Sequence, residues 1–335
     1  MEKSDSNSTG SDAETIAALA QAGEAIKAEV GKIIVGQTDV INQVLTAFFA
    51  RGHCVIEGVP GLAKTLMISS LTETMSLDFT RVQFTPDLMP TDITGTTLLN
   101  DDEHGKRHFT FAKGPVFTNI LLADEINRTP PKTQAALLEA MEERQVTVAG
   151  QTRPLDAPFL VLATQNPIEL EGTYPLPEAQ LDRFLLNPVI QYLSTEDEIK
   201  MVSETTGIDR EEPQPVLGAE DILTLQSLVR QVPAPENVVA YAVALVTATR
   251  PQADSCDEWT SKRVKWGAGS RGAQALILAA KARALLDGRA NASSEDVKLM
   301  AKSALRHRVL PSFFAESEGL GADEIVDHLL ETISA

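Results

Sequence analysis

Apolar residues recur along the chain in two patterns, and the change between them divides the sequence into two parts. Up to about Ser194, short continuous apolar runs alternate with amphipathic stretches. Continuous apolar runs are typical of parallel strands, because helices cover both faces of such a sheet. After Ser194 the apolar residues recur only at helical spacing. The pattern therefore predicts an α/β domain, with a parallel sheet flanked by helices, followed by an all-helical domain.

The predicted strands are short apolar runs bounded by polar residues or glycine. They cover residues 53–57, 79–84, 119–125, 159–163 and 185–190. Glycines and short alternating runs over residues 93–117 predict a β-hairpin insertion between the second and third strands. We expect its acidic tip, residues 101–105, to meet a partner protein or to line a pore. The alternative is a solvated acidic loop.

The predicted helices carry apolar residues three or four positions apart, so that each has one apolar face. They cover residues 13–31, 37–48, 66–71, 131–144, 196–204, 222–232, 238–246, 273–286, 293–307 and 324–332. Ser293 and Asp296 stand three residues apart, which is typical of a capping box at the start of a helix. Residues 1–12 are mostly Ser, Asp, Asn and Gly, and this composition predicts disorder.

Length and composition fit two domains of ordinary size. The chain has 335 residues, of which 43% are hydrophobic, and this is enough for two cores. Prolines and acids at residues 211–216 predict a connector, so we place the α/β domain at 13–212 and the helical domain at 213–335. Cys54 and Cys256 are too few for a disulfide framework or a cysteine metal site.

The net charge of −18 constrains the partners of the chain. A nucleic-acid surface needs clustered Lys and Arg, so the acidity argues against general nucleic-acid binding, although a local basic channel is compatible with it. The N-terminus carries no apolar signal segment, and the apolar stretch at 238–248 is too short to span a bilayer. We expect a cytoplasmic protein without membrane insertion.

The most informative motif covers residues 58–65 and joins an apolar strand to a helical stretch. In that context a glycine loop turns its N–H groups toward phosphate, and the helix N-terminus adds partial positive charge. Lys64 then supplies a cation for the β- and γ-phosphates, and the Thr65 hydroxyl is suited to Mg²⁺. Ala63 stands where glycine usually precedes the lysine, which is tolerable only if this residue does not need a positive φ. The alternative is a Gly-Pro turn that happens to precede Lys-Thr.

Two further strand ends carry polar groups that suit ATP hydrolysis. Asp124 and Glu125 end the third predicted strand. The carboxyl ends of parallel strands lie at one edge of a sheet, so we expect Asp124 to hold Mg²⁺ and Glu125 to orient the attacking water. Asn166 ends the next strand, and its amide can bind both the γ-phosphate and the water. The alternative for Asp124 and Glu125 is a pair of solvated acids at a strand end. The alternative for Asn166 is a turn residue before Pro167.

Two arginines are candidates for stabilising negative charge in the transition state. Arg183 precedes the last predicted strand, from where it could reach the γ-phosphate bound by a neighbouring copy. Arg271 opens a helix of the second domain, from where it could touch the γ-phosphate and couple that domain to the nucleotide. The alternatives are an intrachain ion pair of Arg183, for example with Asp182, and an exposed Arg271 in a first helical turn.

From about residue 30 to residue 310, the chain closely resembles the MoxR family of AAA+ ATPases. The stretches that carry the resemblance are residues 58–65, 124–134, 138–146, 163–167 and 176–184. The glycine loop of this family also has alanine at the position of Ala63. The resemblance implies an AAA+ core, a hairpin insertion in helix 2 at residues 93–117, and a helical lid. It also implies a homo-oligomeric ring, usually a hexamer.

The resemblance further implies a role for each site residue. Asp124 and Glu125 correspond to Walker B, Asn166 to sensor 1, Arg183 to the arginine finger and Arg271 to sensor 2. The sequence around Arg271 departs from the commoner Ser-Pro-Arg-Ala, and Arg128 could also reach across an interface. The nucleotide-binding residues would be Val35, Gly36 and Gln37 against adenine, and Gly58, Pro60, Gly61, Leu62, Ala63, Lys64, Thr65 and Leu66 around the phosphates.

Our main hypothesis is an ATP-hydrolysing ring motor that remodels a protein client and uses ATP and Mg²⁺. The family resemblance implies a chaperone-like role, often beside a protein with a von Willebrand factor A domain, in the maturation of enzyme complexes. A motor acting on nucleic acid and a slow nucleotide-dependent scaffold are the alternatives. The acidity argues against the first alternative, and Glu125 with Asn166 argues against the second.

Overall fold

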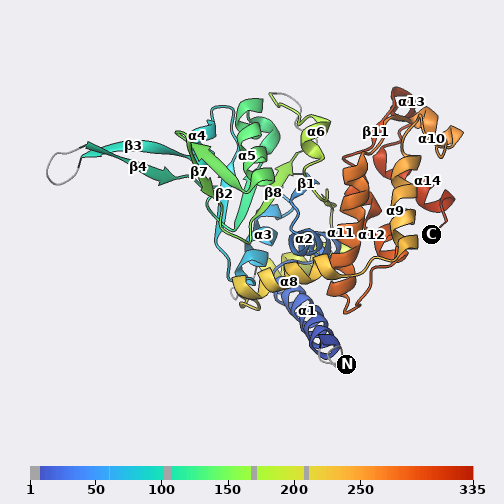
Figure 1. Cartoon of the computed structure of the whole chain (residues 1–335), viewed down its shortest axis with the longest axis horizontal. Helices are drawn as coiled ribbons and strands as arrows, with labels where there is room; N and C mark the ends of the chain where they lie inside the picture. The colour runs from blue at the N-terminus through green and yellow to red at the C-terminus, as the bar shows by residue number, and fades with distance from the viewer. Residues whose placement is uncertain (1–7, 60, 102–106, 167–171, 207–210, 335) are drawn as a thin grey trace, which may run out of the picture.

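Five parallel strands form the central sheet, in the order β2-β5-β8-β1-β9 (Figure 1). They are β1 (Cys54–Gly58), β2 (Phe79–Gln83), β5 (Ile120–Asp124), β8 (Leu160–Gln165) and β9 (Val189–Ile190). The computed structural model describes residues 8–59, 61–101, 107–166, 172–206 and 211–334. The predicted parallel sheet is confirmed, although β9 is shorter than residues 185–190, where Leu186 adds one isolated bridge to Cys54.

Alternate residues of the central strands face two different helical layers. The helices of the first part are α1 (Ser8–Gly31), α2 (Thr38–Phe49), α3 (Lys64–Glu73), α4 (Pro90–Thr94), α5 (Pro131–Glu143) and α6 (Glu178–Leu181), with a 3₁₀ turn at Ile126–Arg128. In β1, Cys54 and Ile56 pack into the hydrophobic cluster of α2 and α3, whereas Val55 packs into the cluster of α5. Helices therefore cover both faces, which is the physical reason for the continuous apolar runs.

The first helix begins earlier than the sequence suggested. α1 starts at Ser8, so the prediction of disorder for residues 1–12 is wrong for residues 8–12, which are helical. Extending an existing helix costs much less than starting one, because each added residue gains one hydrogen bond. The polar segment can therefore continue the helix that the apolar residues stabilise. Residues 1–7 lie outside the described residues.

The predicted hairpin is present and projects far from the body of the molecule (Figure 1). Its strands β3 (Gly95–Asp101) and β4 (Arg107–Lys113) pair antiparallel from Gly95 opposite Lys113 to Asp101 opposite Arg107. Leu98, Leu99 and Phe109 are exposed on it. We predicted a client or pore contact for the tip at residues 101–105, of which residues 102–105 lie outside the described residues.

A second hairpin was not predicted. β6 (Gln145–Val148) and β7 (Gln151–Pro154) pair antiparallel after α5. Ala149 and Gly150 form the turn, with φ of 50° and 76°. Two positive φ values suit the two-residue hairpin turn that usually carries Asn-Gly. Alanine at the first turn position hides this signal in the sequence.

The part of the chain after Ser194 is helical apart from one short strand pair. Its helices are α7 (Thr195–Thr205), α8 (Ala219–Gln231), α9 (Glu236–Ala248), α10 (Glu258–Arg263), α11 (Ser270–Leu286), α12 (Ser294–Leu305), α13 (Phe313–Ser317) and α14 (Ala322–Thr332). The expected all-helical domain needs one correction, because β10 (Val264–Trp266) pairs antiparallel with β11 (Leu310–Pro311). Strands of three and two residues are too short to leave an alternating pattern.

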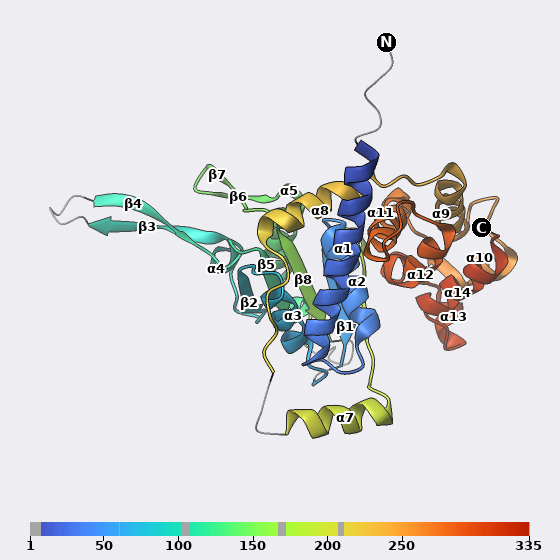
Figure 2. The ribbon, with the colours of Figure 1, turned by 90° about the horizontal axis from the view of Figure 1, so that it is seen from below.

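The helical part packs on the sheet domain through one continuous apolar core. That core runs from α2 and α3 to α9, α11 and α12. α8 contributes a buried hydrogen bond in which Gln226 Nε2 donates to the Phe48 carbonyl at 2.8 Å. In contrast, α7 stands away from the body, and none of its residues is buried (Figure 2). The boundary between residues 212 and 213 stays a prediction. None of the described helices has the length and apolar character that crossing a membrane requires.

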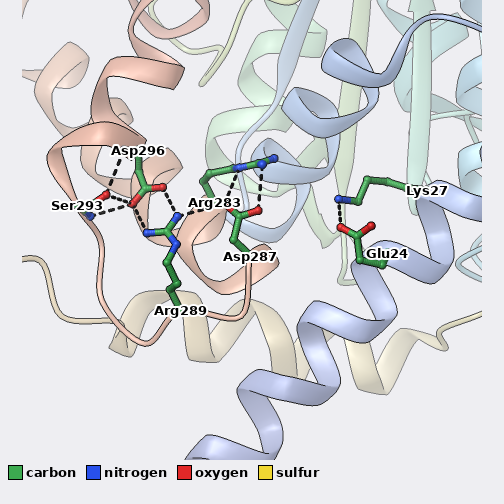
Figure 3. Close-up of polar contacts among 7 residues, drawn as sticks. All are labelled: Glu24, Lys27, Arg283, Asp287, Arg289, Ser293 and Asp296. Carbon is green, nitrogen blue, oxygen red and sulfur yellow. Dashed lines mark hydrogen bonds and ion pairs between the residues drawn. The ribbon is translucent and has the colours of Figure 1, made fainter.

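The connection between α11 and α12 is fixed by a network of charges (Figure 3). Arg289 donates to Asp287 at 3.1 Å and to Asp296 at 2.8 Å. Asp296 accepts a hydrogen bond from the Ser293 N–H at 2.8 Å, and Ser293 Oγ accepts one from the Asp296 N–H at 3.3 Å. This confirms the predicted capping box. The network holds the lid helices in one arrangement, and α11 carries Arg271 at its start.

His53 joins the start of β1 to two other elements. Its Nδ1 accepts a hydrogen bond from the Val161 N–H at 2.9 Å, and its Nε2 lies 3.2 Å from the Met141 carbonyl. Both contacts are satisfied when the ring is neutral and carries its proton on Nε2. Burial of the ring lowers the pKa of His53 from 6.5 to about 4.

We predict that mild acid destabilises the fold through His53. Because its folded pKa lies below its unfolded pKa, the unfolded chain binds the proton more tightly, and the free energy of unfolding falls as the pH drops from 6.5 toward 4. The contribution should be roughly 2 to 3 kcal/mol between pH 7.5 and pH 4.5. Urea unfolding at both pH values should show a smaller loss in His53→Gln than in the wild type. An equal loss in both proteins would contradict this assignment.

Candidate active site

One cavity lies at the carboxyl edge of the sheet, where β1, β5 and β8 end side by side. It has a volume of about 520 Å³, and the sequence predicted every described residue that lines it as part of the site. These residues are Gly61, Ala63, Lys64, Thr65, Leu66, Asp124, Glu125 and Asn166. The loop after β1 and the ends of β5 and β8 supply them, because parallel strands direct their carboxyl ends to the same edge.

Lys64 is a cation that the fold has partly removed from water. Its Nζ donates a hydrogen bond to the Gly58 carbonyl at 2.7 Å. Partial burial lowers the pKa of Lys64, and the negative charges of Asp124 and Glu125 offset part of that effect. A nearby anion strongly stabilises an ammonium group that has been partly removed from water. The loop is therefore suited to binding a phosphate group.

The glycine loop is shaped by three residues with little or no side chain. Gly61 has a φ of 86°, which favours glycine, and a Cβ at Gly58 would lie 3.1 Å from atoms of Ile190. Ala63 has a φ of 53° and precedes α3 in a left-handed conformation. The expectation that this position needs no positive φ is therefore wrong. The chain must turn sharply from the loop into α3, and an L-residue there costs about 1 to 2 kcal/mol.

Asp124 is held from two sides. Its Oδ1 accepts a hydrogen bond from Thr164 Oγ1 at 2.6 Å, and its Oδ2 accepts two from Arg81, at 2.7 and 3.1 Å. The Asp124 carboxylate and the Thr65 hydroxyl are oxygen donors that fit Mg²⁺. No group of three or more His, Cys, Asp and Glu side chains suited to a metal occurs among the described residues. A Mg²⁺ ion here would therefore take its other ligands from phosphate and water, as this ion commonly does.

Glu125 is held by Gln83 of β2 and by Arg128 of the 3₁₀ turn that follows it. Its Oε2 accepts hydrogen bonds from Gln83 Nε2 at 2.7 Å and from Arg128 at 2.9 Å. Gln83 in turn accepts one from Arg81 at 2.8 Å. Arg81 and Gln83 thus connect the two acids at the end of β5. We had not predicted either residue, although their alternation in β2 and the pairing of Gln83 with Asp124 bring both beside the site.

Some predicted nucleotide-binding residues do not line the cavity. Val35 is buried, Gly36 has a φ of 74°, and Gln37 donates a hydrogen bond to the Gln191 carbonyl at 3.0 Å. Leu62 packs against the hydrophobic core. Pro60 lies outside the described residues. The adenine contact therefore stays a prediction for this segment.

Arg183 and Arg271 lie together in a second, separate cavity of about 260 Å³. Arg183 contacts Glu142 Oε2 at 3.0 Å, and Arg271 contacts Glu142 Oε1 at 2.9 Å. The alternative for Arg183, an intrachain ion pair with Asp182 or another acid, is therefore what the isolated chain shows, with Glu142 as the acid. Asp182 itself pairs with Arg308 at 2.7 Å. Among the described residues, none lines both cavities. The two arginines therefore do not line the first cavity of their own chain, which we call the P-loop cavity after the glycine loop at residues 58–65.

Comparisons with known proteins find similarity in both parts of the chain. The profile of the "ATPase family associated with various cellular activities (AAA)" matches residues 53–186, and that of the "AAA lid domain" matches residues 256–329. "Uncharacterized protein YeaC" of Bacillus subtilis is 42% identical over 312 residues, which cover 93% of each chain. "Chaperone MoxR1" of Mycobacterium tuberculosis is 39% identical over 322 residues, covering 96% of this chain and 84% of the relative.

A third relative and a solved structure extend the match over nearly the whole chain. "Protein MoxR" of Methylorubrum extorquens is 30% identical and covers 92% of this chain and 93% of its own. The crystal structure of a candidate ATPase from Cytophaga hutchinsonii is 41% identical, with a TM-score of 0.90 and 98% of both chains covered. The similarity therefore includes both the sheet domain and the lid.

We predict that Ala63→Gly stabilises the chain in the absence of nucleotide. Relief of the left-handed conformation outweighs the added freedom of the unfolded chain, so the free energy of unfolding should rise by about 0.5 to 1 kcal/mol. Ala135→Gly, at an exposed helical position of α5, should lower it by about 0.5 to 1 kcal/mol. Urea unfolding of both variants tests the difference in sign. A loss of stability in Ala63→Gly would contradict the strained conformation.

We further predict that Arg81 competes with Mg²⁺ for Asp124. Arg81→Gln should lower the Mg²⁺ midpoint for binding a fluorescent ADP analogue by about two- to fivefold, because a partly exposed ion pair no longer opposes the metal. Arg107→Gln, in an exposed pair with Asp101 on the hairpin, is the matched control. A higher midpoint in Arg81→Gln would mean that Arg81 prepares Asp124 for the metal instead.

Proposed function

The chain belongs to the MoxR family of AAA+ ATPases, and from that premise we propose that it is a ring motor. It hydrolyses ATP where two neighbouring copies meet and uses the energy to remodel a protein client. The observation that carries this proposal is the separation of the charges. The P-loop cavity contains the lysine and the acids, whereas Arg183 and Arg271 line another cavity. A second copy can bring both sets together around one nucleotide.

The residues of the P-loop cavity bind the phosphates and prepare the water. Backbone N–H groups of the glycine loop and the Lys64 ammonium hold the phosphate oxygens. Thr65 and Asp124 would hold Mg²⁺, which would supply positive charge against the phosphates. Glu125 turns from Gln83 and Arg128 toward the water and accepts its proton, while the Asn166 amide positions that water.

Arg183 and Arg271 act on the nucleotide of the next copy. Their guanidinium groups neutralise the charge that spreads over the transferred phosphoryl group, in the manner of an arginine finger. A site completed by a neighbour requires a head-to-tail interface, and such an interface closes into a ring when the rotation allows it. We propose six copies, which is the usual number in this family.

The client is a protein, and a partner with a von Willebrand factor A domain presents it in the cytoplasm. The name of the Mycobacterium relative, "Chaperone MoxR1", supports a chaperone-like role. The hairpin of β3 and β4 is the contact that we propose, because it extends from the body and exposes Leu98, Leu99 and Phe109. Exposed apolar side chains of this kind are suited to unfolded or partly folded protein segments.

We predict that Glu125→Gln binds ATP but barely hydrolyses it. The amide keeps the shape of the side chain and cannot accept the proton of water, so the turnover rate should fall at least about 100-fold. Fluorescent ATP binding and phosphate release, measured side by side, separate the two effects. Glu139→Gln, at an exposed position of α5, is the matched control and should keep both. Full turnover in Glu125→Gln would reject Glu125 as the catalytic base.

A further inference from the structure

Glu142 joins two arginines from opposite parts of the chain. It lies in the last turn of α5, and each of its carboxylate oxygens contacts one guanidinium. Arg183 follows α6 in the sheet domain, whereas Arg271 is in the first turn of α11 in the lid. One carboxylate therefore bridges an arginine of the sheet domain and an arginine of the lid.

The surrounding cavity has a large excess of positive charge. Its lining includes the carboxylates Glu142 and Asp182 and the arginines Arg51, Arg144, Arg183, Arg230, Arg271 and Arg308. This contrasts with the net charge of −18 of the whole chain. Within the part of the chain that the structure describes, Arg51, Arg144 and Arg230 have no carboxylate at ion-pair distance. Six arginines around two acids favour the entry of a further anion.

The same crowding of positive charge affects the pKa of Arg144. Partial desolvation lowers the pKa of Arg144, and the nearby charges of Arg51 and Arg230 lower it further. The charges of these arginines therefore oppose one another in the isolated chain. A bound phosphate group would relieve that repulsion, because it accepts hydrogen bonds from several guanidinium groups at once.

The Glu142 carboxylate is held only weakly in this cavity. The last turn of a helix carries partial negative charge, which disfavours a carboxylate there. The Glu142 side chain is 39% exposed and that of Arg271 is 49% exposed. Ion pairs with this much exposure contribute little, and a phosphate carries more charge than a carboxylate. A phosphate group can therefore replace the carboxylate at small cost.

We propose that Glu142 is a positioning residue that occupies the place of a phosphate group between Arg183 and Arg271 until copies assemble. The terminal phosphate of the nucleotide on a neighbouring copy displaces the Glu142 carboxylate and takes over both arginines. This inference rests on the proposed function, because it assumes that both arginines act on a neighbour. Its consequence is that Glu142 opposes assembly, since each new contact must first break two ion pairs.

The test compares assembly with and without the Glu142 charge. Glu142→Gln keeps the shape of the side chain, and Glu143→Gln changes an exposed neighbouring acid on the same helix. The protein concentration that gives half of the maximal ATPase rate per chain should fall about two- to fivefold in Glu142→Gln only. Glu142→Asp keeps the charge on a shorter side chain and should give an intermediate value.

A second measurement does not depend on turnover. Sedimentation with ATP in the Glu125→Gln background should show assembly at lower protein concentration when Glu142→Gln is added. The inference is overturned if Glu142→Gln assembles like the wild type or needs more protein. If Arg183→Ala weakens assembly in the same experiment, the proposed function stands. A wild-type rate per chain that does not depend on protein concentration would overturn both.

Discussion

The molecule depends on a balance of charges at the carboxyl edge of its sheet. Lys64, Asp124 and Glu125 lie in one cavity. Partial burial lowers the pKa of Lys64, and the negative charges of the two acids raise it. The parallel order of β5, β8 and β1 makes this possible, because three strands end side by side. Arg81 and Gln83 from β2 then hold the acids in their resting positions. The sheet thus provides a site that can bind phosphate and whose acids are already oriented by hydrogen bonds.

The second balance of charges lies between the sheet domain and the lid. The fixed connection of α11 and α12 keeps the lid helices together, and the shared core attaches them to α2. Arg271 therefore meets Glu142 and Arg183 in the second cavity, away from the lining of the first. Each chain has one site rich in phosphate ligands and another rich in arginine. This complementarity is the physical reason for proposing that copies work in contact.

Residues with a local signature could be predicted from the sequence. The apolar runs gave the central strands, and the spacing of Ser293 and Asp296 gave the start of α12. Features that depend on distant contacts could not be predicted. The place of Arg81 follows from the pairing of β2 with β5, and that of Glu142 follows from packing of the lid. The positive φ of Ala63 was missed because alanine usually avoids that conformation.

The most direct test of the account is to mix two inactive variants. Arg183→Ala keeps Glu125, and Glu125→Gln keeps Arg183, so a complete site can form only where two different chains meet. With equal amounts and random assembly, about a quarter of the contacts pair an intact cavity with an intact arginine, so about a quarter of the wild-type ATPase rate should return. A mixture that is no more active than the two variants measured separately would contradict hydrolysis at a site shared between copies.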